Sequence, residues 1–388
     1  MKEKIIDLGM HPYADTFISK DQLNLSEPVF PLECYLNKKN FEIKLGVKTN
    51  PDDRYNLYDY SYTSSNSSFS RNYWSSYCKD IINSRLINYE SSILEIGSND
   101  GYLLSLFKKE GFKKVTGYDS SKKMVDVAKK SNIKTIHGLF NSKNAAKLKI
   151  KYDMIIANNV FNHSDNPKDF LNGISSCLSN NGIFVFEVPY WLDTIKDYRF
   201  DQIYHEHVSY FTVKSAKYML ESNGLKIFKV QKTEYHGGSI RIYCSLNNQS
   251  INDYEKFIIE EENNRLFDPL TYKNYSEVIQ KRKFETLNKI YRLKLENKKI
   301  VAVGAAAKGN TLLNYYGLNN KIIDYVTDNS ELKIGKYTPL TRIPILSDEE
   351  VFQKYEEVYA LILSWNISDI LKDKLLLMDE LNMLNFTL

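Results

Sequence analysis

The sequence predicts an α/β protein with two separate open-sheet domains, a small N-terminal module and a helical connection between the domains. Two Gly-containing turns support this prediction, ILEIGSNDGYLL near residue 97 and VAVGAAAKGN near residue 304. Each turn follows a short apolar run and precedes an amphipathic stretch, which is the pattern of a strand, a loop and a helix. Further apolar runs alternate with helical patterns, as in a mostly parallel sheet with helices on both faces.

Length and composition are those of an ordinary globular protein. The 388 residues are 43% hydrophobic and 26% charged, which suggests two or three domains. The net charge of +4 comes from scattered Lys and Arg residues, so we expect neither nucleic acid nor a membrane as a partner. No apolar run approaches the length of a transmembrane helix, and the start, MKEKIIDLGMHPYADTF, lacks the apolar core of a signal peptide. We therefore expect a cytoplasmic protein.

The first two regions of the chain differ in pattern. Residues 1 to 70 are predicted to form the small module, with strands in FPLECYL and FEIKLGV before a turn-rich segment. Residues 71 to 250 are predicted to form the first α/β domain, whose strand candidates are ILEI, KKVTGYD, IKTIHG, YDMIIANNV and GIFVFEV. This domain ends with GLKIFKVQKTE and SIRIYCSLN, which the short turn YHGG joins into an antiparallel pair. A Rossmann-like sheet with an antiparallel terminal hairpin is typical of class I methyltransferase domains.

The remaining chain is predicted to form a connection and a second domain. Residues 251 to 298 are highly charged and helical in pattern, with no strand signal. From residue 299 to residue 388 a second strand, Gly-containing turn and helix are followed by the strand candidates KIIDYVTDNS and EVYALILSWN. We expect a smaller Rossmann-like α/β domain there.

The first Gly-containing turn is the predicted cofactor site. Gly97 and Gly101 allow a tight turn and a close approach of a ligand to the backbone. Asp119 ends the next strand candidate and can accept hydrogen bonds from the ribose hydroxyls of an adenosine. The turn is not GxGxxG, and Glu95 would repel a pyrophosphate but could hold the amino-acid end of a methyl donor. We therefore expect S-adenosylmethionine and not NAD; the alternative is a Gly-rich turn with a structural Asp119.

Four further residues are candidates for contacts with the same cofactor. Asn158 and Asn159 end the fourth strand, at the carboxyl edge where open sheets bind ligands, although Asn at a strand end more often forms a turn. Leu139 and Phe140 follow the third strand and could flank adenine, with core packing as the alternative. We include all four as cofactor-binding candidates.

The densest group of reactive side chains lies in DQIYHEHVSYF. His207 and Glu206 could form a base and its orienting carboxylate, and Tyr204 could be an acid or a hydrogen-bond donor. His205 and His207 would share one face of a strand, which is compatible with a metal site. We expect no metal, because no further ligands follow at suitable spacing. The structural alternative is a set of satisfied polar residues at a domain seam.

A second polar group lies in the turn between the last two strands of the first domain. It contains His236, two glycines, Ser239 and Arg241. The glycines let a ligand or another backbone come close to the turn. We therefore treat His236, Ser239 and Arg241 as candidates for substrate binding, although Arg241 could instead pair with an acid.

Taken together, these stretches resemble the nucleotide-sugar C-methyltransferases, three-domain enzymes that methylate carbon 3 of keto-deoxysugars during antibiotic and surface-polysaccharide synthesis. The matching stretches run from about residue 7 to 345 in the family's order. They are LGMHPYADTF, YDYSYTSS, ILEIGSNDGYLL, ANNVFNH, FEVPY, FDQIYHEHVSYF, HGGSIRIY, VGAAAKGNTLLNYYG and DNSELKIGKYTP.

The resemblance implies a role for each matching residue. S-adenosyl-L-methionine would be bound by Glu95, Gly97, Asn99, Gly101 and Asp119. The family's catalytic base matches His207, with Tyr204 and Glu206 beside it. The sugar nucleotide would be bound by residues of the YDYSYTSS stretch, of the second polar group and of the C-terminal domain, namely Tyr60, Tyr62, His236, Ser239, Arg241, Lys308, Gly309 and Asn310.

The N-terminal module departs from the family pattern. That domain normally binds zinc through cysteine pairs, but the chain begins only a few residues before LGMHP, which the first pair would precede, and a lone Cys34 stands at the place of the second pair. The four cysteines lie far apart and form no CxxC pair. We therefore expect neither zinc nor a disulfide framework.

The reaction that the resemblance implies starts at a carbon next to a ketone. His207, made more basic by Glu206, would remove a proton, and the enolate, stabilised by Tyr204, would attack the sulfonium methyl group. Lys308, at the amino end of a helix, would meet the diphosphate. The alternatives are a sugar-nucleotide O-methyltransferase and a non-catalytic relative that binds a nucleotide-sugar, with an NAD dehydrogenase third. We expect a small-molecule sugar nucleotide as the partner, and a monomer or homodimer.

Overall fold

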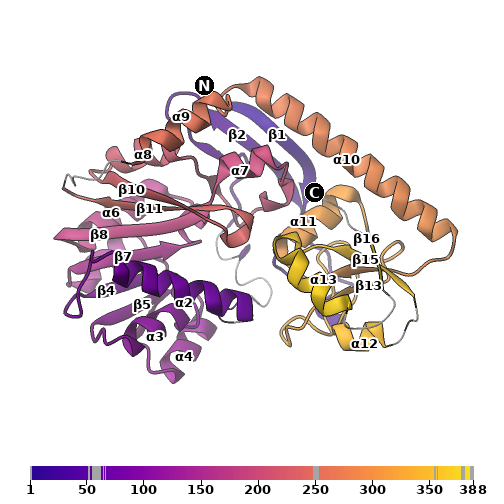
Figure 1. Ribbon diagram of the computed structural model, residues 1–388, viewed down its shortest axis with the longest axis horizontal. Helices are drawn as coiled ribbons and strands as arrows, with labels where there is room; N and C mark the ends of the chain where they lie inside the picture. The colour runs from indigo at the N-terminus through magenta and orange to yellow at the C-terminus, as the bar shows by residue number, and fades with distance from the viewer. Residues whose placement is uncertain are drawn as a thin grey trace.

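The computed structural model describes residues 2–50, 53–54, 63, 65, 67–247, 253–353, 355, 357–376 and 381–384. Two α/β domains lie at opposite ends of the molecule, with an N-terminal sheet between them (Figure 1). The long helix α10 (Pro269–Leu295) runs from beside this sheet along the C-terminal domain. Among the described residues, no helix combines the length and apolar character that crossing a membrane requires. Tyr60 and Tyr62 lie outside the described residues.

The central domain is built on a seven-stranded sheet in the order β10-β11-β8-β7-β4-β5-β6. Neighbouring strands are parallel except around β11, which is antiparallel to both β8 and β10. This confirms the predicted class I methyltransferase sheet with its antiparallel hairpin. The strands are β4 (Ile93–Ile96), β5 (Val115–Asp119), β6 (Thr135–His137), β7 (Tyr152–Asn158), β8 (Leu178–Pro189), β10 (Lys226–Thr233) and β11 (Ser239–Ser245).

The topology of this sheet indicates where a ligand would bind. The chain runs from β4 to β5 and β6 on one side and then returns to β7 on the other side of β4, so the order reverses at β4. Open α/β sheets bind ligands outside the carboxyl ends of the strands at such a reversal. All four residues of β4 are buried, as expected for a parallel strand that is covered on both faces.

Helices with clear start signals cover the two faces of the sheet. The N-cap side chains of Ser67, Ser121, Asn141, Asn166 and Thr212 each accept a hydrogen bond from a backbone N–H in the first turn. The helices are α2 (Ser68–Asn83), α3 (Tyr102–Lys109), α4 (Lys122–Lys130), α5 (Ser142–Ala145), α6 (Pro167–Cys177), α7 (Trp191–Lys196) and α8 (Val213–Glu221).

The N-terminal sheet has the order β1-β2-β3-β9, and its last strand comes from the central domain. Its strands are β1 (Lys2–His11), β2 (Phe30–Asn37), β3 (Ile43–Leu45) and β9 (Ser209–Tyr210). The sequence predicted β2 and β3 but missed β1, because two irregularities in its pairing with β2 interrupt the apolar alternation. Leu32, Cys34 and Leu36 are completely buried in the core. Within the part of the chain that is described, no group of three or more His, Cys, Asp or Glu side chains could hold a metal ion.

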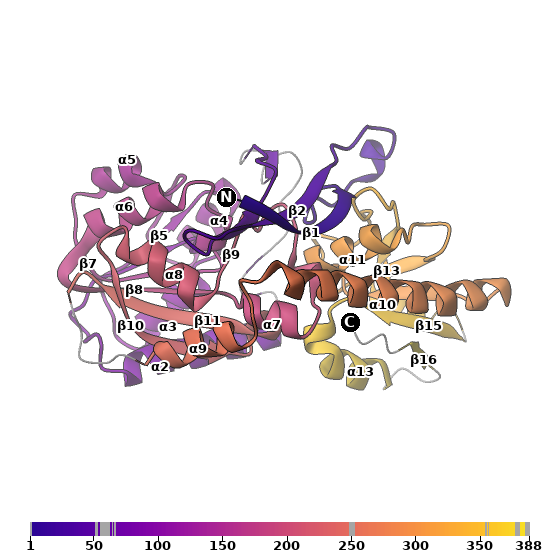
Figure 2. The same ribbon diagram turned by 90° about the horizontal axis from the view of Figure 1, so that it is seen from above.

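The C-terminal part consists of two helices and a parallel sheet. Helix α9 (Glu255–Asn263) and α10 fill the charged region, and α10 lies along the C-terminal domain when the molecule is viewed from above (Figure 2). The sheet has the order β14-β13-β12-β15-β16. Its elements are β12 (Ile300–Val303), α11 (Ala307–Tyr316), β13 (Tyr325–Thr327), β14 (Ile345–Leu346), α12 (Asp348–Phe352), β15 (Val358–Ile362), α13 (Ser368–Leu376) and β16 (Leu381–Leu384).

Candidate active site

The turn after β4 is held in a conformation that requires its glycines. Gly97, Asn99 and Gly101 all have positive φ, at 67°, 49° and 77°. A Cβ on Gly97 would lie 2.2 Å from Cγ2 of Val160, so the glycine is also needed for packing. Asp119, at the end of β5, accepts hydrogen bonds from the backbone N–H groups of Asn99 and Ser121, both at 2.8 Å. The turn and the next strand end are thus fixed to each other.

Three buried carboxyl groups give this turn its electrostatic character. Glu95, Asp100 and Asp119 are 7%, 7% and 8% exposed. Burial and the charges of the two aspartates raise the pKa of Glu95 well above its usual range, and among the described residues its Oε2 has no hydrogen-bond partner. A pyrophosphate would add negative charge here, whereas a ligand with an ammonium and a sulfonium group would relieve the repulsion. The residues present therefore fit S-adenosylmethionine.

A cavity of about 280 Å³ opens beside this turn. Its wall includes Gly97, Tyr118, Leu139, Phe140 and His163, which combine apolar and aromatic surface with a polar group. Of the predicted cofactor contacts, Gly97, Leu139 and Phe140 line the cavity. The other predicted contacts are not among its lining residues. They lie in β4, in the turn after it, or at the ends of β5 and β7, namely Glu95, Asn99, Gly101, Asp119, Asn158 and Asn159.

Tyr204 and His207 form a hydrogen-bonded pair within a tight turn. The backbone N–H of His207 donates to the carbonyl of Tyr204 at 2.9 Å. The Tyr204 hydroxyl lies 2.7 Å from Nε2 of His207, and Nδ1 lies 2.9 Å from the carbonyl oxygen of Gln202. Because a carbonyl can only accept, Nδ1 carries the proton and Nε2 accepts from the tyrosine. Burial lowers the pKa of His207 to about 4, so its imidazole is neutral near pH 7.

His163 connects this pair with the cavity. It ends the short helix Phe161–His163 after β7, and its ring both lines the cavity and lies 5.0 Å from the ring of His207, measured between centroids. The two rings meet edge to face, at 85°. His207 is therefore one ring removed from the predicted cofactor pocket. Sequence reasoning missed His163; its only signal was its position just beyond a strand that ends at the ligand-binding edge.

Glu206 and His205 face the N-terminal segment. The carboxylate of Glu206 accepts hydrogen bonds from the backbone N–H groups of Asp15 at 3.0 Å and Ala14 at 3.5 Å. The ring nitrogens of His205 lie 3.3 Å from the carbonyl oxygens of Pro12 and Pro31. Residues 204–207 form a turn and not a strand, so the assumption that His205 and His207 share a strand face is wrong. His207 is oriented by donating from Nδ1–H to the carbonyl oxygen of Gln202, whereas Glu206 contacts the N-terminal segment.

Several candidates for substrate binding are buried with partners in the protein. Ser239 donates to the carbonyl of Tyr235 at 2.9 Å, and Arg241 donates from Nε to Glu187 at 2.9 Å. Asn310 donates to the carbonyl of Ala14 at 2.7 Å. A Cβ on Gly309 would lie 2.8 Å from Cβ of Leu363, so this glycine is required by the packing of α11 against the residue that follows β15.

Lys308 and His236 lie at the seam between the central and C-terminal domains. The Nζ of Lys308 donates to the side chain of Asn366 and lies 4.8 Å from the ring centroid of Trp365. The carbonyl oxygen of His236 accepts a hydrogen bond from the side chain of Gln202 at 2.7 Å. Since Gln202 also orients His207, this seam is joined to the Tyr204–His207 pair.

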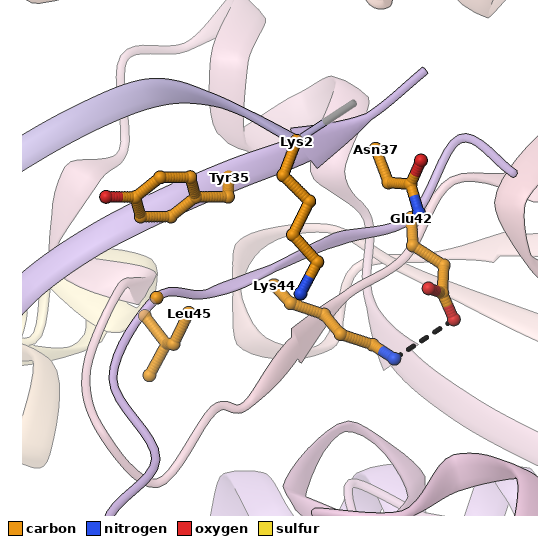
Figure 3. A pocket seen from close by; sticks show the side chains of 7 residues that line it. Lys2, Tyr35, Asn37, Glu42, Lys44 and Leu45 are labelled. Atoms are coloured by element: carbon orange, nitrogen blue, oxygen red, sulfur yellow. Dashed lines mark hydrogen bonds and ion pairs between the residues drawn. The ribbon is translucent and has the colours of Figure 1, made fainter. Parts of the chain in front are cut away.

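A second hollow, of about 160 Å³, lies on the N-terminal sheet. Figure 3 shows Lys2 and Lys44 extending into it near Tyr35, with Lys44 bonded to Glu42 at 3.0 Å. Of the predicted catalytic, cofactor and substrate residues that the structure describes, none lines this hollow.

Comparisons with known proteins bear on this site. A family model described as a methyltransferase domain matches residues 71–230, and one described as a C-methyltransferase C-terminal domain matches residues 234–380. The chain is also similar to the C-methyltransferase NovU of Streptomyces niveus, with 26% identity over 372 residues, which are 93% of this chain and 87% of that protein.

The protein is an S-adenosylmethionine-dependent methyltransferase. In this methyltransferase, the match to the methyltransferase-domain model covers most of the seven-stranded sheet, and the match to the C-methyltransferase C-terminal model begins at the hairpin of that sheet.

Solved structures similar to this methyltransferase include two bacterial enzymes. One is magnesium protoporphyrin IX methyltransferase of Synechocystis PCC 6803 with bound SAH, with 17% identity and a TM-score of 0.36, covering 45% of this chain and 82% of that chain. Another is an S-adenosylmethionine-dependent methyltransferase of Clostridium acetobutylicum, with 14% identity and a TM-score of 0.37, covering 47% of this chain and 94% of that chain.

Proposed function

We propose that this methyltransferase transfers the methyl group to carbon 3 of a keto-deoxysugar nucleotide, next to the 4-ketone. The observation that carries the proposal is the position of His207, a neutral imidazole one ring removed from the donor cavity. Support also comes from the C-methyltransferase C-terminal domain and from the similarity to NovU, which is named as a C-methyltransferase. The sequence stretches shared with nucleotide-sugar C-methyltransferases favour this class of acceptor.

The pair of His207 and Tyr204 supplies the acid and base groups. The hydroxyl of Tyr204 covers Nε2 of His207 in the structure, so it must leave Nε2 before that atom can accept a proton from carbon. When the tyrosine turns to donate to the ketone oxygen of the acceptor, it uncovers the base and stabilises the negative charge that develops on that oxygen. The carbonyl of Gln202 keeps its bond to Nδ1–H and stabilises the imidazolium that forms.

The donor-side residues bind and orient. S-adenosylmethionine supplies an electrophilic methyl group on a sulfonium, which a carbanion can attack in line. Glu95 would bind the donor's cationic amino-acid end and Asp119 its ribose, while Leu139 and Phe140 would flank the adenine. Holding two reactants in near-attack geometry can lower a barrier by up to about 7–11 kcal/mol. Lys308, in the first turn of α11, is the residue that we assign to the acceptor's diphosphate.

Product analysis tests the proposal directly. The purified protein is incubated with S-adenosylmethionine and a panel of 4-keto-6-deoxy sugar nucleotides, and products are identified by mass spectrometry and NMR. We expect a mass increase of one methylene and a new carbon–carbon bond at carbon 3. In deuterated buffer without the donor, wild type should exchange the proton at carbon 3. A product methylated on oxygen, without such exchange, would contradict the proposal.

Two variants test the assigned pair. His207→Asn should lower turnover by about 10²–10⁴-fold because the base is lost, and it should also abolish proton exchange. Tyr204→Phe should lower turnover by about 10²–10³-fold because a donor to the developing oxyanion is lost. Tyr218→Phe, an exposed tyrosine on α8, is the matched control and should keep wild-type turnover. Full turnover in a folded His207→Asn variant would overturn the assignment.

A further inference from the structure

An indole from the C-terminal domain lies against the hairpin turn of the central domain. Trp365 begins the short helix Trp365–Ile367 after β15, and Gly237 lies in the turn between β10 and β11. A Cβ on Gly237 would lie 2.2 Å from Cη2 of Trp365, and Gly237 has a φ of 85°. The sequence alone did not show which group approaches the two-glycine turn. In the structure, the turn accommodates this tryptophan.

Two cations lie against this same indole. The guanidinium carbon of Arg199 lies 4.6 Å from the ring centroid of Trp365, and Nζ of Lys308 lies 4.8 Å from it. Arg199 also pairs with Asp197, whose side chain is about half exposed. Two like charges repel each other, and a neutral ring offsets that repulsion only weakly. An anion with several charged oxygens would bind the same pair more strongly, with charge-assisted bonds that Arg can make in bidentate form.

The indole is also bonded to the segment that holds the base. Its Nε1–H donates to Oδ2 of Asp201 at 2.5 Å. Asp201 is completely buried, and among the described residues its Oδ1 has no hydrogen-bond partner. The next residue, Gln202, supplies the carbonyl that orients Nδ1 of His207. A movement of Trp365 would therefore be transmitted to His207 through the adjacent residues Asp201 and Gln202.

Arg241, a cation that the sequence analysis named as a candidate for binding the sugar nucleotide, is already paired. It is almost completely buried against Glu187, and its guanidinium carbon lies 4.0 Å from the ring centroid of Tyr77. Arg199 is the cation that shares the seam with Lys308.

We propose that Arg199 and Lys308 together bind the diphosphate of the acceptor, and that this binding displaces the indole of Trp365, which lies against both cations. The inference rests on the proposed function, which supplies a diphosphate-bearing acceptor. Arg199 exchanges its half-exposed partner Asp197 for phosphate oxygens. Because the indole N–H leaves Asp201 at the same time, occupation of the diphosphate site adjusts the segment that orients the base.

Calorimetry with nucleoside diphosphates tests the pair of cations. Wild type, Arg199→Ala and Arg282→Ala are each titrated with UDP, dTDP, GDP and CDP, and with the corresponding nucleosides. Arg282 is the matched control, since it also lies over an aromatic ring, that of Tyr198 at 4.7 Å. We expect Arg199→Ala to weaken binding of the preferred diphosphate by about 10- to 100-fold, the loss of one charge-assisted contact. Binding of the nucleosides, and all binding by Arg282→Ala, should not change.

Tryptophan emission tests the displacement. Trp74 and Trp191 are buried elsewhere, at 5% and 1% exposure, and should give a constant background. The saturating diphosphate should change the emission of wild type. In Trp365→Phe this change should be absent, although the diphosphate still binds. Emission of Trp365 that stays constant at saturation would overturn the displacement.

The outcomes separate this inference from the proposed function. If wild type binds a nucleoside diphosphate and Arg199→Ala binds it equally well, the inference fails while the acceptor class stands. If wild type binds neither these diphosphates nor inorganic pyrophosphate, both fail. Arg199→Lys, with melting curves for every variant, guards against misfolding, because it keeps the charge without the bidentate geometry and should lie between wild type and Arg199→Ala.

Discussion

The two ring nitrogens of His207 are distinguished by their neighbours. Nδ1 donates to a backbone carbonyl and Nε2 accepts from Tyr204, so the tautomer follows from the local contacts alone. The sequence identified Tyr204 and His207 as candidates but assigned the orienting role to Glu206, which is adjacent in sequence. Adjacent residues in a tight turn point in different directions, and only the folded turn shows that Glu206 faces Asp15.

The pH profile of turnover should reflect the low pKa of His207. A base must be unprotonated, and burial lowers this pKa to about 4, so the active form increases as pH rises through about 4. Above about pH 5.5 this group should therefore contribute no slope to kcat/KM. The measurement is kcat/KM across pH 5 to 8 with saturating donor. A limb that tracks His207 near its ordinary pKa, present in wild type and absent from the residual activity of His207→Asn, would contradict this expectation.

Donor binding should release a proton at Glu95. Its pKa in the free protein is raised by burial and by Asp100 and Asp119, and a cation nearby lowers the pKa of a carboxyl group. Donor affinity should therefore increase as pH rises, until the pH exceeds the raised value. Calorimetry in two buffers of different ionisation enthalpy measures the released proton. Glu95→Gln should abolish the release and weaken donor binding by about tenfold, or about 1.4 kcal/mol.

The helices and strands of the central domain were largely predictable, whereas those that join domains were not. The hairpin of β10 and β11 has a local signal, since two apolar runs flank a short glycine turn. Strand β9 is very short. It pairs with β3, and the strands β4 to β8 of the central sheet lie between these two in the sequence. A short pattern of that kind cannot be distinguished from a loop. His163 and Arg199 were missed because the rings that they contact, those of His207 and Trp365, come from distant segments of the chain.

The buried ion pair between β8 and β11 is where a single substitution should be most damaging. Glu187 is fully buried and Arg241 nearly so, and Tyr73 also donates to Glu187. Arg241→Ala would leave a buried carboxylate without its cation, which typically costs about 3–5 kcal/mol. Urea unfolding should show this loss. The double variant with Glu187→Met and Arg241→Met should recover part of it, and a double variant as unstable as the single one would argue against a charge effect.

At the scale of the whole molecule, one N-terminal segment joins three parts of the structure. Ala14 and Asp15 donate backbone N–H groups to Glu206 of the central domain, while the carbonyl of Ala14 accepts from Asn310 of the C-terminal domain. Ile18 forms a bridge with Tyr337 of the C-terminal domain. The turn that contains Tyr204 and His207 therefore lies where the three parts meet.

Glu206→Gln should act through this junction. The amide keeps the size of the side chain but loses the charge that strengthens its bonds to the N–H groups of Ala14 and Asp15. We expect faster cleavage of the N-terminal segment in limited proteolysis, with an unchanged pH profile of turnover. If Glu206 instead makes His207 more basic, the profile will shift and the proteolysis pattern will stay the same.

Because β9 follows the Tyr204–His207 turn directly and completes the N-terminal sheet, this sheet is not an exchangeable module. Grafting residues 2–50 from a relative would bring a foreign partner for β9 and for Glu206. A chimera that exchanges acceptor preference would need to transplant residues 204–211 together with the graft. The turn of residues 204–207 and the N-terminal sheet should thus be inherited as one unit.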